Sequence, residues 1–234
     1  YVHDMEFTDM AHARVIRPPN YHAQIQDLND TEVRAMPGVI EVILDGSFLS
    51  VVCEREEQAI WAASKLGRIT VWDESKELNS KDIFVQLKNN PRQSLPVVEG
   101  VAKESPVQPF RPPENSSKTL SATYQRPYHM HGSIGPSAAI ALYDAQVLKV
   151  WTHSQGIFPL RLALADVLAL AEDKIHLVHV PGAGWYSHNG ADDVALDAAL
   201  AARAVPGRPI MLRWERADEH AWEPFGSAMQ IELK

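Results

Sequence analysis

A proline-rich stretch in the middle of the chain constrains its fold more than any other feature. Between about residues 73 and 118, a polar segment without helical or strand period contains Pro91, Pro96, Pro106, Pro109, Pro112 and Pro113. Proline fixes φ and removes a backbone donor, so this composition favours a linker or a long wrapping loop. A chain of 234 residues is long enough for two modest cores. We therefore expect two patterned regions joined by a proline-rich connector.

The region before the connector has the pattern of a small α+β unit. Small apolar residues recur at helical spacing before Gly67, which predicts a helix over residues 54–66 that ends at this glycine. A short helix is expected at residues 31–35, and strands are expected at residues 11–17, 39–44, 48–53 and 68–72. This order predicts a first domain over residues 1–75 and a connector over residues 76–118.

The region after the connector is patterned again from residue 119. It predicts a hairpin of residues 137–143 and 147–152 and helices at residues 157–170 and 192–204. Further strands are expected at residues 119–124 and 175–180, with a final strand pair at 210–214 and 228–233. Asn189 is expected to cap the second helix. We therefore predict a second domain over residues 119–234, in which helices cover an antiparallel sheet. The fold class of the whole chain is then α+β.

Charge, hydropathy and cysteine content exclude several classes of function. The formal net charge is −8, and Lys and Arg do not cluster, which argues against a nucleic-acid partner. No stretch approaches the ~20 apolar residues that a membrane-spanning helix needs. Cys53 is the only cysteine, so this chain has neither an internal disulfide nor the ligands of an iron–sulfur centre. Because the chain starts at Tyr1 within patterned sequence, we interpret it as truncated or processed.

Residues 181–193 form a glycine-rich segment between a predicted strand and a predicted helix. Glycines let the backbone approach a bound group closely, and a helix N-terminus offers unpaired N–H groups, so the segment predicts a phosphate or oxyanion site. A tight strand-to-helix turn needs the same residues and is the commoner explanation. The spacing does not match a dinucleotide-binding motif, because Ser187 stands where the third glycine belongs. Asp192 and Asp193 are interpreted as helix N-terminal residues rather than an acid–base pair.

Histidines offer a second candidate site. If residues 128–131 are extended, His129 and His131 point to one face, and His153, His188 or Asp192 are candidate third ligands for a metal ion. Hydrogen-bonded histidines at a polar interface are the commoner arrangement. A small metal hydrolase would require His129, His131 and His153 to converge on one ion.

Several motifs together resemble one enzyme family. In the first region these are His-Ala-Arg-Val-Ile-Arg-Pro-Pro at residues 12–19, Met-Pro-Gly-Val at 36–39 and Phe-Leu-Ser-Val-Val-Cys-Glu-Arg at 48–55. In the second region they are Pro127-Tyr128, Ile-Gly-Pro-Ser at 134–137, Trp-Thr-His-Ser-Gln-Gly at 151–156, residues 182–193 and Trp-Glu-Arg at 214–216. The two sets resemble the α/β hammerhead domain and the first molybdopterin-binding domain of the xanthine dehydrogenase and aldehyde oxidase family. The similarity points to the branch with the isoquinoline 1-oxidoreductase and nicotinate dehydrogenase large subunits.

The resemblance implies part of a bacterial subunit, cytoplasmic or periplasmic, with a molybdenum–pterin cofactor. Such a subunit hydroxylates a carbon of an N-heterocycle or an aldehyde with water as the oxygen source, and passes electrons to an iron–sulfur partner subunit. The loop that presents backbone amides near the molybdenum corresponds here to Gly182, Ala183, Gly184, Trp185 and Tyr186. Gln155 matches a family glutamine close to the cofactor. His129 stands at or near the position of a glutamine found in many relatives, and this chain departs from the family there.

The resemblance also implies that essential parts lie outside this chain. The family's general-base glutamate and most pterin contacts belong to a later domain, so no catalytic residue and no side-chain metal ligand is assigned here. We expect residues 119–234 to be incomplete without a C-terminal cofactor-binding domain or subunit, and the fragment alone to be inactive and not to hold the cofactor. The alternative is a non-catalytic assembly or scaffold module of a larger oxidoreductase complex, in which the glycine-rich segment is only a turn.

Overall fold

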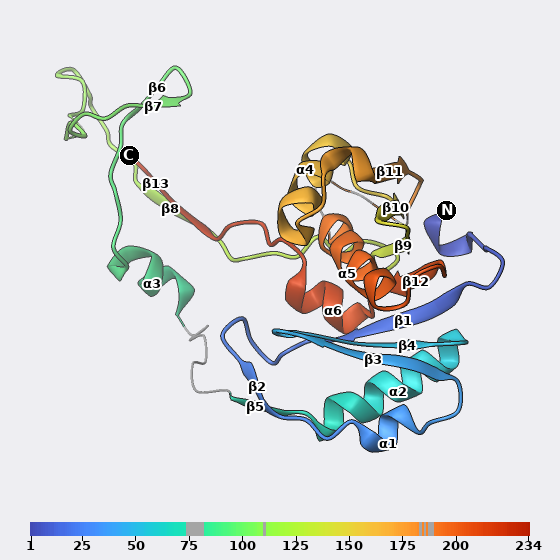
Figure 1. The fold of residues 1–234 in the computed structure, drawn as a ribbon. Coiled ribbons are helices and arrows are strands. Elements are labelled where there is room, and N and C mark those ends of the chain that lie inside the picture. The colour runs from blue at the N-terminus through green and yellow to red at the C-terminus, as the bar shows by residue number, and fades with distance from the viewer. Residues whose placement is uncertain (74–81, 110, 183, 185, 187–189) are drawn as a thin grey trace. The chain divides into compact units, whose positions relative to one another are not determined.

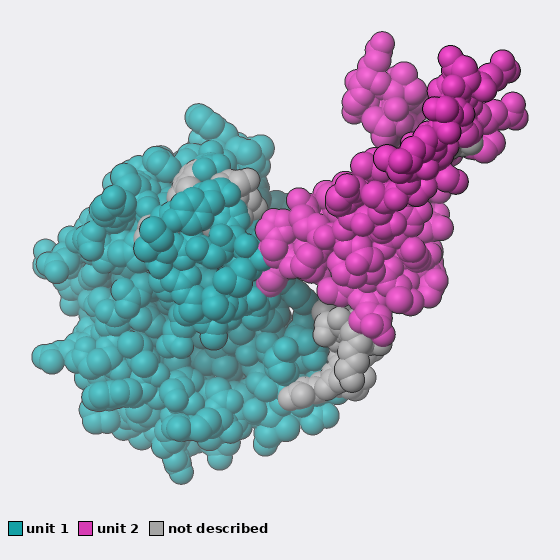
Figure 2. All heavy atoms as spheres, turned by 180° about the vertical axis from the view of Figure 1, so that it is seen from behind, with its two compact units in different colours: residues 1–78, 130–224 teal, residues 79–129, 225–234 magenta. Residues whose placement is uncertain are grey.

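The computed structural model describes residues 1–73, 82–109, 111–182, 184, 186 and 190–234. The chain has an α+β fold and divides into two units, shown in different colours in Figure 2. Residues 1–78 and 130–224 make up unit 1, and residues 79–129 and 225–234 make up unit 2. Each unit is therefore built from segments that are distant in the sequence.

Unit 1 is organised around one mixed sheet of seven strands, in the order β11-β10-β9-β12-β1-β4-β3. Its strands are β1 (Ala11–Ile16), β3 (Val39–Asp45), β4 (Phe48–Cys53), β9 (Ala138–Asp144), β10 (Val147–Thr152), β11 (Ile175–His179) and β12 (Ile210–Arg213). The pairs β1–β12 and β10–β11 are parallel, and the other neighbours are antiparallel. The β1–β12 pair joins the two patterned regions of the sequence in one sheet, with Ala11 opposite Ile210.

Helices cover both faces of this sheet, as Figure 1 shows for α5 and α2. The helical elements of unit 1 are η1 (Val2–Asp4), α1 (Thr31–Arg34), α2 (Glu56–Ile69), α4 (Ile157–Leu168), η2 (Glu172–Lys174), α5 (Ala191–Ala204) and α6 (Arg216–Trp222). A separate ribbon pairs β2 (Gln24–Asp27) with β5 (Val71–Asp73). Within the described residues, no helix combines the length and the apolar character needed to cross a membrane.

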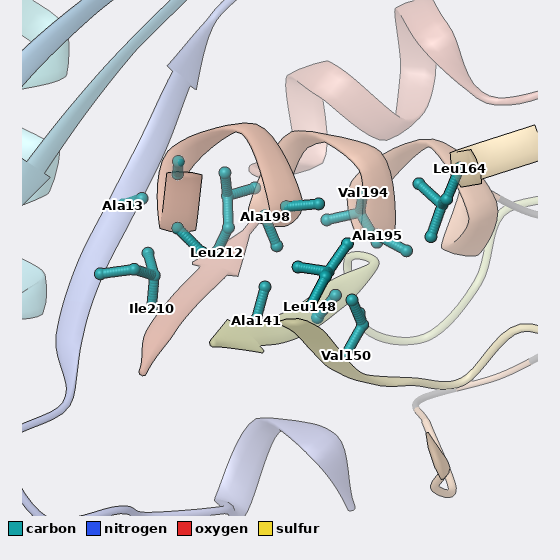
Figure 3. Close-up of a cluster of buried hydrophobic side chains, with 14 of the residues drawn as sticks. Ala13, Ala141, Leu148, Val150, Leu164, Val194, Ala195, Ala198, Ile210 and Leu212 are labelled. Atoms are coloured by element: carbon teal, nitrogen blue, oxygen red, sulfur yellow. The ribbon is translucent and has the colours of Figure 1, made fainter. Parts of the chain in front are cut away.

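The main core lies between α5, α4 and one face of the sheet. Because side chains alternate along a strand, Ala11, Ala13 and Val15 of β1 point into this core, whereas Ile16 packs with α2 on the other face. The contact face of α5 consists largely of alanines, which bring its backbone close to the strands. Figure 3 shows Ala195 and Ala198 of α5 in this cluster. The close approach fixes α5, and therefore the position at which the preceding glycine-rich segment must end.

Unit 2 contains a short helix and two small antiparallel ribbons. Its elements are α3 (Ile83–Asn89), β6 (Val97–Val98), β7 (Val101–Ala102), β8 (Ala122–Arg126) and β13 (Met229–Leu233). The ribbon of β8 and β13 pairs Ile231 with Tyr124. The connector was expected to lack regular structure, and α3 shows that this expectation is wrong for residues 83–89.

Three sequence predictions about local structure are wrong. The sheet of the second region is not purely antiparallel, because β10 and β11 run parallel. Residues 210–214 and 228–233 do not pair with each other, because β12 lies between β9 and β1 whereas β13 pairs with β8. The helix expected to stop at Gly67 continues to Ile69, and Thr70 caps it by donating from its hydroxyl to the carbonyl of Leu66 at 2.7 Å. The predicted capping residue Asn189 lies outside the described residues. The domain boundaries at residues 75 and 118 stay a prediction.

Candidate functional site

Four loops of unit 1 meet where strands of the seven-stranded sheet begin or end, which we call the sheet edge. β10 and β11 are parallel and end together, with Thr152 opposite His179. β9 is antiparallel to both β10 and β12, so it starts at this same edge, with Ala138 opposite Arg213 at the end of β12. The segments that follow β10, β11 and β12 and the segment that precedes β9 are therefore neighbours. The glycine-rich segment is the one that follows β11.

The start of the glycine-rich segment is held against His153. The amide of Val180 donates to the carbonyl of Thr152 at 2.9 Å, which extends the pairing with β10 beyond the strand. A Cβ on Gly182 would lie 2.2 Å from Cγ of His153, a distance that no side chain tolerates. His153 is only 1% exposed and cannot move out of the way. Gly182 is therefore required by packing.

His153 is a neutral hydrogen-bond acceptor in this arrangement. Burial, and then the nearby His3 and His179, lower the pKa of His153 from 6.5 to about 4. The amide of Ala138 donates to Nε2 of His153 at 3.3 Å, and this contact requires an unprotonated Nε2. Because the imidazole stays neutral at ordinary pH, it accepts from the first residue of β9 while it packs against Gly182, and so links β9 to the start of the glycine-rich segment.

Gly184 and Tyr186 face the segment that precedes β9, residues 130–137, which we call the β9 loop. Gly184 has φ of +85°, and a Cβ there would lie 3.1 Å from both the backbone nitrogen of Ile134 and the ring of Tyr186. The Tyr186 ring lies nearly parallel to His131, with centroids 6.2 Å apart and an angle of 12°. Tyr186 itself has φ of +27°, which is uncommon for a residue with a side chain. The two loops are thus closely apposed.

The β9 loop is fastened by charged side chains of α6 and the residue after it. Nη1 and Nη2 of Arg216 donate to the carbonyls of Ser133 and Ile134, at 2.6 and 2.5 Å. Glu219 accepts from the amide of Ser137. Glu223 accepts from the amide of His131 at 2.5 Å and from that of Gly132 at 3.3 Å. Five main-chain groups of the loop are thus paired with ionisable side chains.

Both carboxyl groups of this arrangement are buried, since Glu219 and Glu223 are each 1% exposed. Burial raises the pKa of Glu219, as does the nearby Glu223, while the hydrogen bonds from Ser137 act in the opposite direction. Glu219 therefore retains its proton to a higher pH than an isolated glutamate does.

A second buried cluster fixes the end of the glycine-rich segment. Nε1 of Trp214 donates to Oδ2 of Asp197 at 2.8 Å, and the guanidinium of Arg17 pairs with the same oxygen. Arg17 also lies 4.6 Å above the Trp214 ring. Burial raises the pKa of Asp197 to about 6, although Arg17 opposes the shift. A Cβ on Gly190 would lie 2.3 Å from Cζ3 of Trp214, so a side chain at the start of α5 would force the buried indole to shift.

The predicted site residues have different outcomes. Gly182, Gly184 and Tyr186 lie together at the sheet edge, whereas Ala183, Trp185 and His188 lie outside the described residues. Gln155 is exposed in the turn between β10 and α4, two residues after His153. His129 belongs to unit 2, where its backbone pairs with Gly226. In the described part of the chain, no three His, Cys, Asp or Glu side chains gather in a way that could hold a metal ion, so His129, His131 and His153 do not form the site that a metal hydrolase requires.

Sequence reasoning missed three residues, Arg216, Glu219 and Glu223. Their spacing carried a usable signal, because residues three and four apart on a helix share a face. Two acidic residues and one basic residue on a helix face were therefore available as a pattern, although nothing in it indicated burial.

Comparison with known proteins identifies the family. The molybdopterin cofactor-binding domain family matches residues 111–234, which is more than half of the chain. The chain belongs to this family. One of the subunits of nicotinate dehydrogenase from Pseudomonas putida is 37% identical over 241 aligned residues, which cover 100% of this chain and 20% of that protein.

Solved structures show the same fold. Quinoline 2-oxidoreductase from Pseudomonas putida 86 matches with a TM-score of 0.73 and 18% identity, over 99% of this chain and 34% of that one. Aldehyde oxidoreductase from Desulfovibrio gigas matches with a TM-score of 0.69 and 18% identity, over 97% of this chain and 29% of that one. The chain thus spans about a fifth of the nicotinate dehydrogenase subunit and about a third of these two structures.

The residues at the sheet edge fit a molybdenum–pterin group. Gly184 presents a backbone without a side chain beside the 57% exposed Tyr186, and the segment leads into the N-terminus of the 14-residue helix α5. The amide of Gly184 donates to the carbonyl of Gly182 at 3.2 Å, so the feature that suits the anionic oxygens of the cofactor is the N-terminus of α5. Burial raises the pKa of Cys53 to about 11 in the core strand β4, so Cys53 is not available as a thiolate ligand.

Proposed function

We propose that this chain is part of the cofactor-binding subunit of a molybdenum hydroxylase that oxidises an N-heterocycle with water as the oxygen donor. The observation that carries the proposal is the 37% identity to the nicotinate dehydrogenase subunit along the whole chain. The aldehyde alternative has narrower support. The molybdenum-binding subunit of the Escherichia coli aldehyde oxidoreductase, PaoC, is 34% identical, but over only 42% of this chain.

In this proposal residues 1–75 form the α/β hammerhead domain, residues 76–118 the connector and residues 119–234 the first cofactor-binding domain. A further cofactor-binding domain or subunit completes the site and supplies the general base. An iron–sulfur subunit accepts the electrons. When bound, the molybdenum–pterin group would supply the redox chemistry, in which a substrate C–H and one water give C–OH, two electrons and two protons.

This chain's own contribution is to bind and orient. Gly184 and Tyr186 present backbone at the edge of the cofactor, and His153 fixes the start of their loop through Gly182. Tyr186 and Ile134, which are 57% and 80% exposed, supply apolar surface that excludes water once a group is bound between the loops. Gln155 and His129 are proposed to approach the cofactor in the complete protein, with His129 in place of the family glutamine.

The test is the content of molybdenum and pterin per polypeptide in the complete gene product, purified with its natural partners from a host that makes the cofactor. The same protein from a host unable to make the cofactor is the control. We expect near-stoichiometric molybdenum, and ¹⁸O from labelled water in the hydroxylated product of nicotinate. A folded, partner-bound protein without molybdenum would refute the proposal and leave the scaffold module as the explanation.

A further inference from the structure

Arg216, Glu219 and Glu223 form a cluster of three ionisable side chains next to one loop. Glu219 and Glu223 lie four residues apart and Arg216 three residues before Glu219, so all three point to the same side of α6. This side faces the β9 loop, residues 130–137. The two carboxyl groups are buried next to each other, and burial raises the pKa of Glu219.

Each side chain of the cluster forms hydrogen bonds with particular main-chain groups of the loop. Two guanidinium nitrogens meet the successive carbonyls of Ser133 and Ile134, while the carboxylates meet amides on either side of them. Hydrogen bonds with an ionised partner are roughly twice as strong as neutral ones, and they are directional. Together they fix the path of the β9 loop at both ends and in the middle.

A purely structural role does not account for this arrangement. Apolar residues of similar volume are often as stabilising as a buried charged cluster, or more so. What these hydrogen bonds provide is a defined conformation of a loop in which Ile134 is 80% and Met130 39% exposed, whereas Ser133 and Ser137 are buried. A Cβ on Gly184 would lie 3.1 Å from the nitrogen of Ile134, and the ring of Tyr186 lies beside that of His131, so the loop lies close to both residues.

We propose that Arg216, Glu219 and Glu223 are positioning residues that hold the β9 loop against Gly184 and Tyr186 and so set one wall of the cofactor site. The inference rests on the proposed function, since it assigns a wall of the site that the proposed function describes. Displacement of the loop would remove the Ile134 nitrogen and the His131 ring from their places, and the cofactor would lose a fixed boundary on that side.

The first measurement is amide exchange in the 234-residue chain. Leucine fills a space similar to that of glutamate but accepts no hydrogen bond. We expect Glu219→Leu to speed exchange at Ser137, and Glu223→Leu to speed exchange at His131 and Gly132, each by at least about tenfold, as expected for loss of a charge-assisted bond. Asp218→Asn is the matched control, because Asp218 lies on the same helix and caps the amide of Glu215 at 2.9 Å without touching the loop.

The second measurement is the rate of pterin release from the complete protein. We expect the leucine variants to release pterin at least about tenfold faster than wild type, and Glu219→Gln and Glu223→Gln to stay within about twofold, because glutamine retains the acceptor oxygen. Circular dichroism checks that each variant is folded. Glutamine variants that behave like leucine variants would overturn the inference, because the acceptor would then not be what matters.

The two hypotheses fail in different ways. Pterin-loaded wild type with leucine variants that release pterin at the wild-type rate would overturn the positioning role and leave the proposed function standing. Wild type without pterin would overturn the proposed function, and the positioning role with it.

Discussion

Replacement of Gly190 by alanine tests the packing that ends the glycine-rich segment. Gly190 has φ of −73°, which any residue adopts, so the substitution introduces no backbone strain of its own. Its Cβ would lie 2.3 Å from Cζ3 and 2.8 Å from Cη2 of Trp214. The indole cannot shift easily, since it is 1% exposed and bound through Nε1 to Asp197.

The expected cost follows from these contacts. Overpacking of a well-packed core costs about 1–3 kcal/mol, and a rigid buried ring places this site at the upper end. We therefore expect Gly190→Ala to lower the free energy of unfolding by about 3 kcal/mol. For a chain of this size that corresponds to a fall in Tm of about 6–12 °C.

A double-mutant cycle with Trp214→Phe isolates the cause. The phenylalanine ring is too short to reach the positions of Cζ3 and Cη2, so Gly190→Ala should cost less than about 1 kcal/mol in that background. The coupling free energy would then be about 2 kcal/mol, within the range for residues in contact. Urea unfolding followed by circular dichroism measures all four variants. Costs that add within about 0.5 kcal/mol would refute the steric explanation.

Two further predictions concern titration and reactivity. Because burial lowers the pKa of His153 from 6.5 to about 4, the unfolded chain takes up a proton there first as pH falls. The contribution of His153 to the free energy of unfolding is complete above pH 6.5 and decreases by up to about 3 kcal/mol between pH 6.5 and 4. Urea unfolding of His153→Gln should therefore show a flatter pH dependence over that window. The Cys53 thiol, buried in β4 with its pKa raised to about 11, should react with a disulfide reagent at about pH 8 at least about 100-fold faster in urea than in the folded chain. Equal rates in the two conditions would show that folding does not protect the Cys53 thiol.

Local pattern predicted local structure well. The hairpin of β9 and β10 and the helix α5 are confirmed within one or two residues, because alternation and helical spacing are properties of contiguous sequence. The position of β12 was not predictable in this way. Its parallel pairing sets Ile210 beside Ala11, 199 residues earlier, and no turn residue marks such a contact.

The candidate site was likewise predictable only where it depends on contiguous sequence. The glycine-rich segment stands out in the sequence because its glycines are contiguous with a strand and a helix. The opposing wall does not stand out, since it depends on the β9 loop and on side chains more than 80 residues further along. Burial of Glu219 and Glu223 follows only from the tertiary structure, because charged residues on a short helix are usually solvated.

The structure also distinguishes the roles of glycines that the sequence analysis treated as one motif. Gly182 and Gly190 are each explained by a buried ring, His153 in one case and Trp214 in the other, and these contacts require glycine whether or not a ligand binds. Gly184 is different, because its positive φ turns the chain toward the β9 loop and toward the exposed Tyr186. A functional role for the segment therefore rests on Gly184 and Tyr186, while Gly182 and Gly190 fix the two ends between which they are held.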